Sequence, residues 1–101
     1  MSARKRRLHP RARADLRSIL LYTRAQWGVE QRRRYRALLE RGIDSLTRHP
    51  ELGEARDDLF PGCRTLRVEQ HIVYYHLTES EIIVGRVLHV RQDATGNIVP
   101  F

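Results

Sequence analysis

The sequence is poor in cysteine and in long apolar runs, and each shortage excludes a class of protein. Cys63 is the only cysteine among 101 residues, so the chain has no internal disulfide framework and fits a reducing compartment. The basic N-terminus is followed by no apolar stretch, and the later apolar runs fall far short of a membrane span. We therefore expect a cytoplasmic protein with no membrane partner.

Motifs for metal, cofactor or nucleotide chemistry are also missing. No pair of histidines has the close spacing of zinc sites, and His71 and His76 should point to opposite faces of a strand. There is no glycine-rich phosphate loop and no nucleophile elbow. A lone cysteine at the entrance of a strand is usually a small hydrophobic residue, so Cys63 is expected to pack rather than to react. We expect no metal and no cofactor.

Arginine is what the sequence has in excess. The net charge is +7 and is carried by eighteen arginines and a single lysine, Lys5. Guanidinium groups pair bidentately with carboxylates and phosphates, so acidic proteins and nucleic acids both fit as partners. The triplet Arg32-Arg33-Arg34 is most simply a solvated helix face, and the alternative is an electrostatic contact with an acidic partner. Charge of this kind predicts association rather than a particular fold.

Two amphipathic helices are expected in the first half of the chain. Pro10 suits the first position of a helix, and Gly28 supplies the left-handed residue that commonly ends one. Between them, one stripe recurs at helical spacing: Ala12, Leu16, Ile19, Leu20, Thr23 and Trp27. A second stripe follows before Pro50: Tyr35, Leu38, Leu39, Gly42, Ile43 and Leu46. The spacing predicts a tight helical hairpin that Trp27 closes as a core anchor.

The second half of the chain changes to a period of two, which is typical of strands. Three segments are rich in β-branched and aromatic residues and are separated by short polar spacers: Thr65–Val68, Ile72–Leu77 and Ile82–Leu88. They predict three consecutive antiparallel strands. Residues 50–62 predict an ordered loop. Residues 1–7 are either a loose basic arm or an edge strand, because this stretch has no apolar alternation.

The last two predicted strands carry apolar residues on both faces, so we expect central strands that are covered on both sides. One cover is the helical hairpin. The other is a partner or the chain's own tail at residues 94–101. In this tail, Ile98, Val99 and Phe101 either pack on the chain itself or bind a partner. We expect one α+β domain over residues 1–101, with the hairpin on one face of a mainly antiparallel sheet.

Basic residues gather at the ends of the predicted strands. Arg64 begins the first strand, whereas Arg86, His89 and Arg91 lie at the end of the last one. A histidine that titrates near neutral pH beside cations has the groups needed for acid–base cleavage of RNA. A hydrogen bond that caps the strand is the simpler role for His89. The candidates for partner contact are Arg64, His89, Arg91, Ile98, Val99 and Phe101.

Several short motifs occur in a fixed order along the chain: Ala14-Asp15-Leu16, Trp27-Gly28, His49-Pro50-Glu51-Leu52-Gly53, Pro61-Gly62-Cys63-Arg64, His71-Ile72-Val73-Tyr74-Tyr75 and Arg86-Val87-Leu88-His89-Val90-Arg91-Gln92-Asp93. From about Leu8 to Asp93 this order resembles the ParE branch of the ParE/RelE toxin superfamily. Arg6 and Arg7 depart from the usual apolar alternation. His9 stands where a serine or threonine helix cap is expected.

The resemblance implies a RelE-like β-α-α-β-β-β arrangement and the toxin half of a bacterial type II toxin–antitoxin system. It implies a role in plasmid or chromosome stability, with DNA gyrase as the target. It also implies neutralisation by a ParD-like antitoxin, whose disordered acidic tail folds onto the toxin. Such coupled folding and binding suits an arginine-rich surface.

The alternative is a ribosome-dependent mRNA endoribonuclease of RelE type, with Arg64, Arg86 and His89 as its catalytic residues. No tyrosine follows Tyr75, and the only lysine is at the N-terminus, so the dense basic site of such enzymes is only partly present. We therefore favour a gyrase inhibitor that is not an enzyme. Sequence-specific nucleic-acid binding is not expected, because neither helix is a polar recognition helix free of core contacts.

Overall fold

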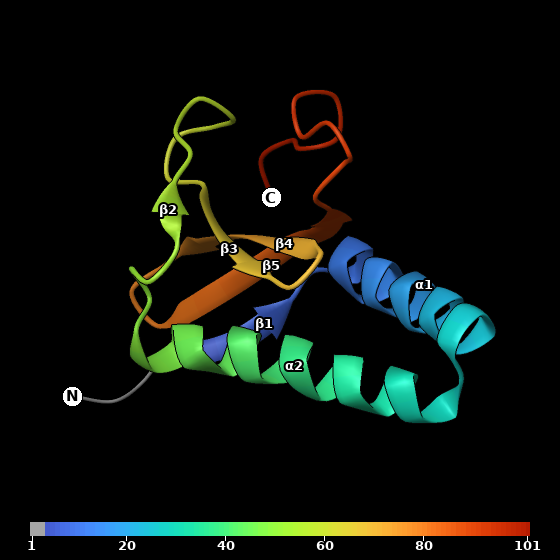
Figure 1. Cartoon of the computed structure of the whole chain (residues 1–101). Coiled ribbons are helices and arrows are strands. Elements are labelled where there is room, and N and C mark those ends of the chain that lie inside the picture. Colours follow the sequence, from blue (N-terminus) through green and yellow to red (C-terminus); the bar gives the residue numbers. More distant parts are fainter. Residues whose placement is uncertain (1–3) are drawn as a thin grey trace.

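A helical hairpin packs against one face of a five-stranded sheet in the computed structural model, which describes residues 4–101 (Figure 1). The elements in chain order are β1 (Lys5–Leu8), α1 (Pro10–Trp27), α2 (Val29–Arg48), β2 (Glu54–Ala55), β3 (Arg64–Val68), β4 (His71–Leu77) and β5 (Glu81–His89). The α+β class and the order of the main elements are confirmed. The loop expected at residues 50–62 contains one additional short strand, β2.

The start of α1 and the link between the helices explain why the hairpin forms. His9 caps α1, because its Nδ1 accepts a hydrogen bond from the backbone N–H of Arg11 at 3.1 Å. A histidine thus does the capping that serine or threonine usually does. Gly28 has φ 92°, which favours glycine, and its N–H donates to the carbonyl of Arg24 at 2.9 Å. A single residue therefore ends α1 and begins α2.

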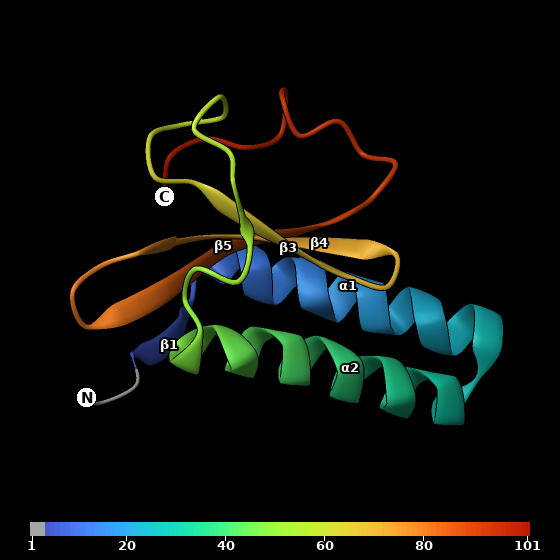
Figure 2. The same cartoon turned by 60° about the vertical axis from the view of Figure 1, so that its left-hand side comes forward.

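Trp27 is not a core anchor, contrary to the expectation from its stripe. Its side chain is 72% exposed, whereas Thr23, one turn earlier, is 8% exposed. The cause is visible in Figures 1 and 2, where the tip of the hairpin extends beyond the end of the sheet. Helical periodicity places Trp27 on the correct face of α1, but no strand lies beneath it at that point. Within residues 4–101, no helix is long and apolar enough to cross a membrane.

The strands are ordered β1-β5-β4-β3-β2, so β4 and β5 lie inside the sheet, as expected, and β3 is also an inner strand because β2 pairs with its outer side. β1 is an edge strand that runs parallel to β5, and the other neighbours are antiparallel. The edge tolerates the arginines of β1, because Arg6 pairs with Asp44 at 2.8 Å and Arg7 approaches Glu81 at 3.8 Å. Part of the N-terminal segment is therefore a strand. Its first three residues lie outside the described range.

The inner core lies between the hairpin and the sheet. Its buried members are Ala12, Ile43, Leu46, Val73, Tyr75, Ile82, Val84 and Val87. Inward-facing positions change parity along β5, because Tyr74 pairs with Arg86 whereas Tyr75 pairs with Val84. Gly85 is the extra residue between these two pairs, which is the geometry of a β-bulge.

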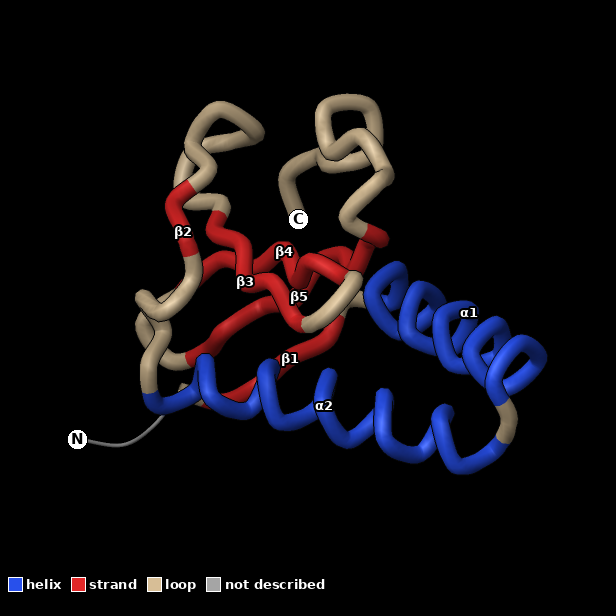
Figure 3. Tube along the Cα trace, viewed as in Figure 1, coloured by secondary structure: helices blue, strands red, loops and turns tan. Residues whose placement is uncertain are grey.

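A second core covers the opposite face of the sheet. Its buried members are Phe60, Cys63, Tyr74, Leu88 and Ile98, with Leu59, Ile72, Ala94 and Phe101 packed around them. Figures 2 and 3 show the loop after β2 and the C-terminal tail on this side of the sheet. A Cβ atom at Gly85 would overlap the ring of Phe101, so the last residue lies directly on the bulge. The second cover of the central strands is therefore the chain's own tail.

Candidate functional site

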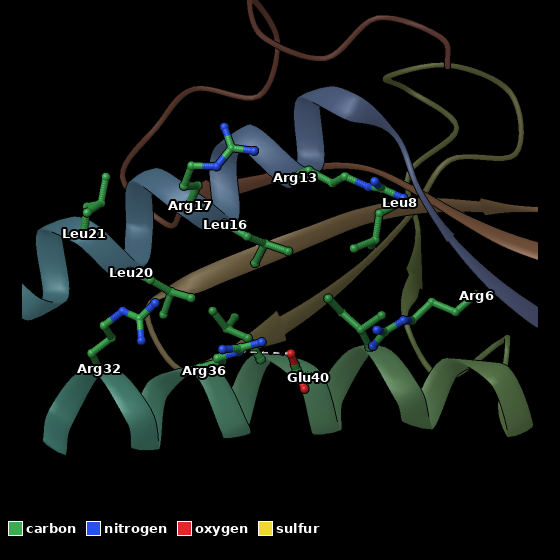
Figure 4. A pocket seen from close by; sticks show the side chains of 12 residues that line it. Arg6, Leu8, Arg13, Leu16, Arg17, Leu20, Leu21, Arg32, Arg36 and Glu40 are labelled. Carbon is green, nitrogen blue, oxygen red and sulfur yellow. Dashed lines mark hydrogen bonds and ion pairs between the residues drawn. The ribbon is translucent and has the colours of Figure 1, made fainter. Parts of the chain in front are cut away.

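A groove runs between the two helices and β1 and has a cavity volume of about 340 Å³ (Figure 4). Its apolar lining consists of Leu8, Leu16, Leu20, Leu39 and Ile43, with the exposed Leu21 at its margin. Its polar lining is almost entirely basic and consists of Arg6, Arg13, Arg17, Arg32, Arg36 and Glu40. We call this feature the arginine groove. It combines an apolar floor with a cationic rim.

Helical spacing creates the arginine groove. Arg13 and Arg17 are one turn apart on α1, and Arg32 and Arg36 are one turn apart on α2. Leu16 and Leu20 lie beside the first pair, as Figure 4 shows, so cationic and apolar rows run next to each other. Figure 4 shows Leu16 and Leu20 pointing from α1 toward α2, whereas Arg17 points away from α2.

Most of the positive charge at the groove is not neutralised within the chain. Arg36 pairs with Glu40 at 3.2 Å, and Arg6 pairs with Asp44 at 2.8 Å. Arg13, Arg17 and Arg32 make no ion pair within 4.0 Å in the described part of the chain. A carboxylate-bearing ligand would thus meet guanidinium groups that are free to pair with it.

A second cavity of about 530 Å³ opens on another side of the hairpin, beside the β3–β4 turn. Its lining contains no arginine, lysine, aspartate or glutamate. The lining residues are Ser18, Ile19, Tyr22, Thr23, Trp27, Gln31, Tyr35, Gln70, His71 and His89. We call it the neutral pocket. Two of its aromatic side chains are largely in solvent, with Tyr22 66% and Trp27 72% exposed.

Hydrogen bonds hold the two histidines of the neutral pocket in place. The Tyr35 hydroxyl accepts from the N–H of Gln70 at 3.2 Å and shares a hydrogen bond of 2.5 Å with Nδ1 of His71. Burial, reinforced by the charge of His89, lowers the pKa of His71 to about 4. The N–H of Arg91 donates to Nδ1 of His89 at 3.1 Å. Because Nδ1 of His89 accepts this bond, the neutral ring of His89 carries its proton on Nε2.

Arg64 and Arg86 are bound to other parts of the chain. Arg64 donates from Nη2 to the carbonyls of Glu51, at 3.1 Å, and Gly53, at 2.6 Å, and so holds the start of the loop after α2. Arg86 donates from Nε to Asp15 at 2.8 Å, and its Nη1 donates to the carbonyl of Asn97 at 3.1 Å. Both guanidinium groups link segments that are distant in sequence.

The strand register separates these arginines from His89. Arg64 lies opposite Tyr75, and His89 lies opposite His71, four positions away along β4. At about 3.3 Å per residue, this separation is roughly 13 Å along the strand, with β4 between the two residues. Arg91 is exposed and lies two residues after His89. The structure therefore does not bring the predicted basic cluster together.

The apolar residues of the tail differ in how they lie. Ile98 is 6% exposed and belongs to the second core, and Phe101 packs on Phe60 with ring centroids 5.1 Å apart. Val99 is 55% exposed. Of the two roles considered for the tail, Ile98 and Phe101 thus pack on the chain itself. A partner that contacts Ile98 would first have to displace the tail.

The structure agrees with the expectations for Cys63 and the histidine faces. Cys63 is buried in the second core, and burial raises the pKa of its thiol to about 11. His71 contacts Tyr35 of α2, whereas His76 contacts Phe60 and Phe101 on the opposite face. Among the described residues, no three histidine, cysteine, aspartate or glutamate side chains are placed to hold a metal ion.

Sequence reasoning missed both the arginine groove and the neutral pocket. The signal for the groove was present, because arginines one turn apart flank the leucine stripe of α1. The neutral pocket depends on how far the hairpin extends past the sheet, and no local sequence pattern predicts this distance.

Known proteins similar in sequence to this chain match it over most of their length. Residues 6–94 match the family described as "ParE toxin of type II toxin-antitoxin system, parDE". Toxin ParE1 of Mycobacterium tuberculosis is 39% identical over 92 residues, covering 90% of this chain and 94% of that protein. Toxin ParE of Escherichia coli is 42% identical over 83 residues, which is 81% of each protein.

A solved structure has the same architecture. It is titled "Chromosomal ParDE TA system from P. aeruginosa", and its matching chain superposes with a TM-score of 0.77 at 22% sequence identity. The match covers 88% of this chain and 98% of that one. At this level of identity the similarity establishes the fold.

Proposed function

The chain belongs to the ParE toxin family of type II toxin–antitoxin systems, and from that premise we propose that it arrests growth by binding and inhibiting DNA gyrase. In this proposal the toxin acts as an inhibitor in the cytoplasm, where gyrase works on DNA. A ParD-like antitoxin neutralises it by binding directly.

The arginine groove carries the proposal for the antitoxin. Its floor suits the apolar side of an amphipathic segment, and Arg13, Arg17 and Arg32 are free to pair with acidic side chains. A disordered acidic tail that folds on binding can fill such a groove and bury a large area, at the cost of ordering the tail. Guanidinium–carboxylate pairs would set the orientation and speed the association.

The positions of Arg64, Arg86 and His89 support inhibition by binding over RNA cleavage. Acid–base cleavage needs its groups within hydrogen-bond reach of one reacting phosphate. Here Arg86 is held by Asp15, Arg64 is held by backbone carbonyls, and His89 lies on another part of the sheet. None of these contacts could be kept if the three side chains gathered around one phosphate.

Purified toxin separates the two functions when both targets are assayed side by side. We expect loss of supercoiling by gyrase and accumulation of gyrase-cleaved DNA, with intact message in a parallel translation reaction read by primer extension. Cut message with normal gyrase activity would overturn the proposal and favour the ribonuclease.

A further inference from the structure

We propose that the neutral pocket holds the toxin's target by receiving an uncharged segment of that protein, with one large apolar side chain in the cavity and a backbone carbonyl at its histidines. This inference rests on the proposed function and adds a second docking site to the same hairpin. The arginine groove would serve the antitoxin, and the neutral pocket would serve the target.

The charge of the two cavities separates their partners. The arginine groove is lined by five arginines, whereas no lining residue of the neutral pocket is acidic, arginine or lysine. An acidic segment would meet no arginine or lysine inside the neutral pocket and would lose hydration there. The chemistry that fits is an apolar side chain, and the cavity of about 530 Å³ lies within the size range of ligand-binding pockets.

Exposed aromatic side chains at the neutral pocket are the second observation. Trp27 and Tyr22 expose more than half of their surface although they sit next to a cavity that could shelter them. Tryptophan and tyrosine are the residues most enriched at the energetic centres of protein interfaces. Placed beside an apolar cavity, they provide the rim that excludes water once a partner side chain has entered.

Hydrogen-bonding groups in the pocket fit a peptide backbone. Nε2 of a neutral His89 carries a proton, and neither this nitrogen nor Nε2 of His71 has a hydrogen-bond partner within residues 4–101. The ring centroids of the two histidines are 5.3 Å apart, so both nitrogens belong to one small region. An acceptor without charge, such as a backbone carbonyl, satisfies the donor on His89 without adding a charge to the pocket.

Trp27→Ala tests the inference directly, with Val29→Ala as the matched control. Trp27 and Val29 flank Gly28 and are both largely exposed, but only Trp27 lines the pocket. The variants are compared by growth arrest on induction without antitoxin, by the concentration that half-inhibits gyrase, and by affinity for the antitoxin. We expect Trp27→Ala to relieve growth arrest and to raise the half-inhibitory concentration about ten-fold or more. Its antitoxin affinity should stay within about three-fold of wild type.

The possible outcomes separate this inference from the proposed function. Growth arrest by Trp27→Ala equal to that of Val29→Ala would overturn the pocket as the target site. An equal loss of antitoxin affinity would assign the pocket to the antitoxin, and a change of oligomeric mass in light scattering would assign it to a second copy. Growth arrest that depends on Trp27, with gyrase unaffected by the wild-type toxin, would keep the pocket and reject gyrase as the target.

Discussion

Asp15 ties α1 to β5 through its side chain. Its Oδ2 accepts from Nε of Arg86 at 2.8 Å and from the N–H of Val87 at 2.9 Å, just after the bulge at Gly85. The side chains of Asp15 and Arg86 are only 16% and 19% exposed. A charge pair in this setting matters most when one partner is removed, because the other is left desolvated.

We expect Asp15→Ala to lower the free energy of unfolding by about 2–3 kcal/mol, because it leaves both the guanidinium group of Arg86 and the N–H of Val87 without their acceptor. Urea denaturation followed by circular dichroism measures this change. Asp44→Ala is the control, because Asp44 is 64% exposed in its pair with Arg6, and its loss should cost less than about 1 kcal/mol. Equal effects of the two substitutions would contradict the role given to Asp15.

His71 makes stability depend on pH. Its folded-state pKa of about 4 lies below the usual value of 6.5, because burial and the nearby His89 disfavour its cationic form. Between these two values the unfolded chain binds more protons than the folded one, so this group's contribution to stability is lost as the pH falls from 7 towards 4. A cationic His71 could only donate in its hydrogen bond with Tyr35.

The measurement is the free energy of unfolding at pH 7, 6 and 5 for the wild type and for His71→Gln. We expect the difference between the two proteins to shrink as the pH falls, because only the wild type loses the contribution of a neutral His71. A difference that stays constant over this range would show that His71 does not titrate as its surroundings imply.

Among the elements, the C-terminal tail acts as a strap over the outer face of the sheet. Phe101 lies on the bulge at Gly85 and against Phe60, whereas Val99 in the same tail points into solvent. We expect Phe101→Ala to destabilise the protein by about 1–2 kcal/mol, less than for a fully buried phenylalanine, and to open the tail to carboxypeptidase. Val99→Ala should change stability by less than about 0.5 kcal/mol. Equal stability and proteolysis of the two variants would mean that the tail is not packed.

The long elements could be predicted from sequence because their hydrophobic periods are strong. The ends of α1 at Pro10 and Trp27 follow from proline and glycine chemistry, and the period of two marks β3, β4 and β5. β2 could not be predicted, because its two residues are held only by pairing with β3. The strand β1 could not be predicted either, because its sequence has no apolar alternation. Its pairing with β5 and its ion pairs hold it at the edge of the sheet.

Site residues were harder to predict because they depend on register and on packing between elements. Arg64, Arg86 and His89 all come from strands, yet the pairing places them in different parts of the sheet. Trp27 belongs to the apolar stripe of α1 but lies past the end of the sheet. Both cavities form only where the two helices meet the rest of the fold. A single-element pattern carries no such information.

For the whole molecule, the excess of arginine matters through its distribution around the hairpin. We expect the double change Arg17→Glu and Arg32→Glu to weaken antitoxin binding about ten-fold or more, because it replaces attraction by repulsion in the arginine groove. Titration calorimetry at two salt concentrations checks this, and the wild-type affinity should fall as salt rises. Arg41→Glu is the control, because Arg41 lies on α2 like Arg32 but does not line the groove. Equal affinities of the double variant and this control would place the antitoxin elsewhere.

The central claim is that this ParE-family toxin inhibits gyrase by binding and that an antitoxin in the arginine groove relieves the inhibition. The most direct measurement is gyrase supercoiling titrated with purified toxin, alone and with equimolar antitoxin. We expect supercoiling to fall with toxin concentration and the antitoxin to restore it for the wild type but not for the Arg17→Glu, Arg32→Glu toxin. Supercoiling that stays unchanged at toxin concentrations that arrest growth would contradict the claim.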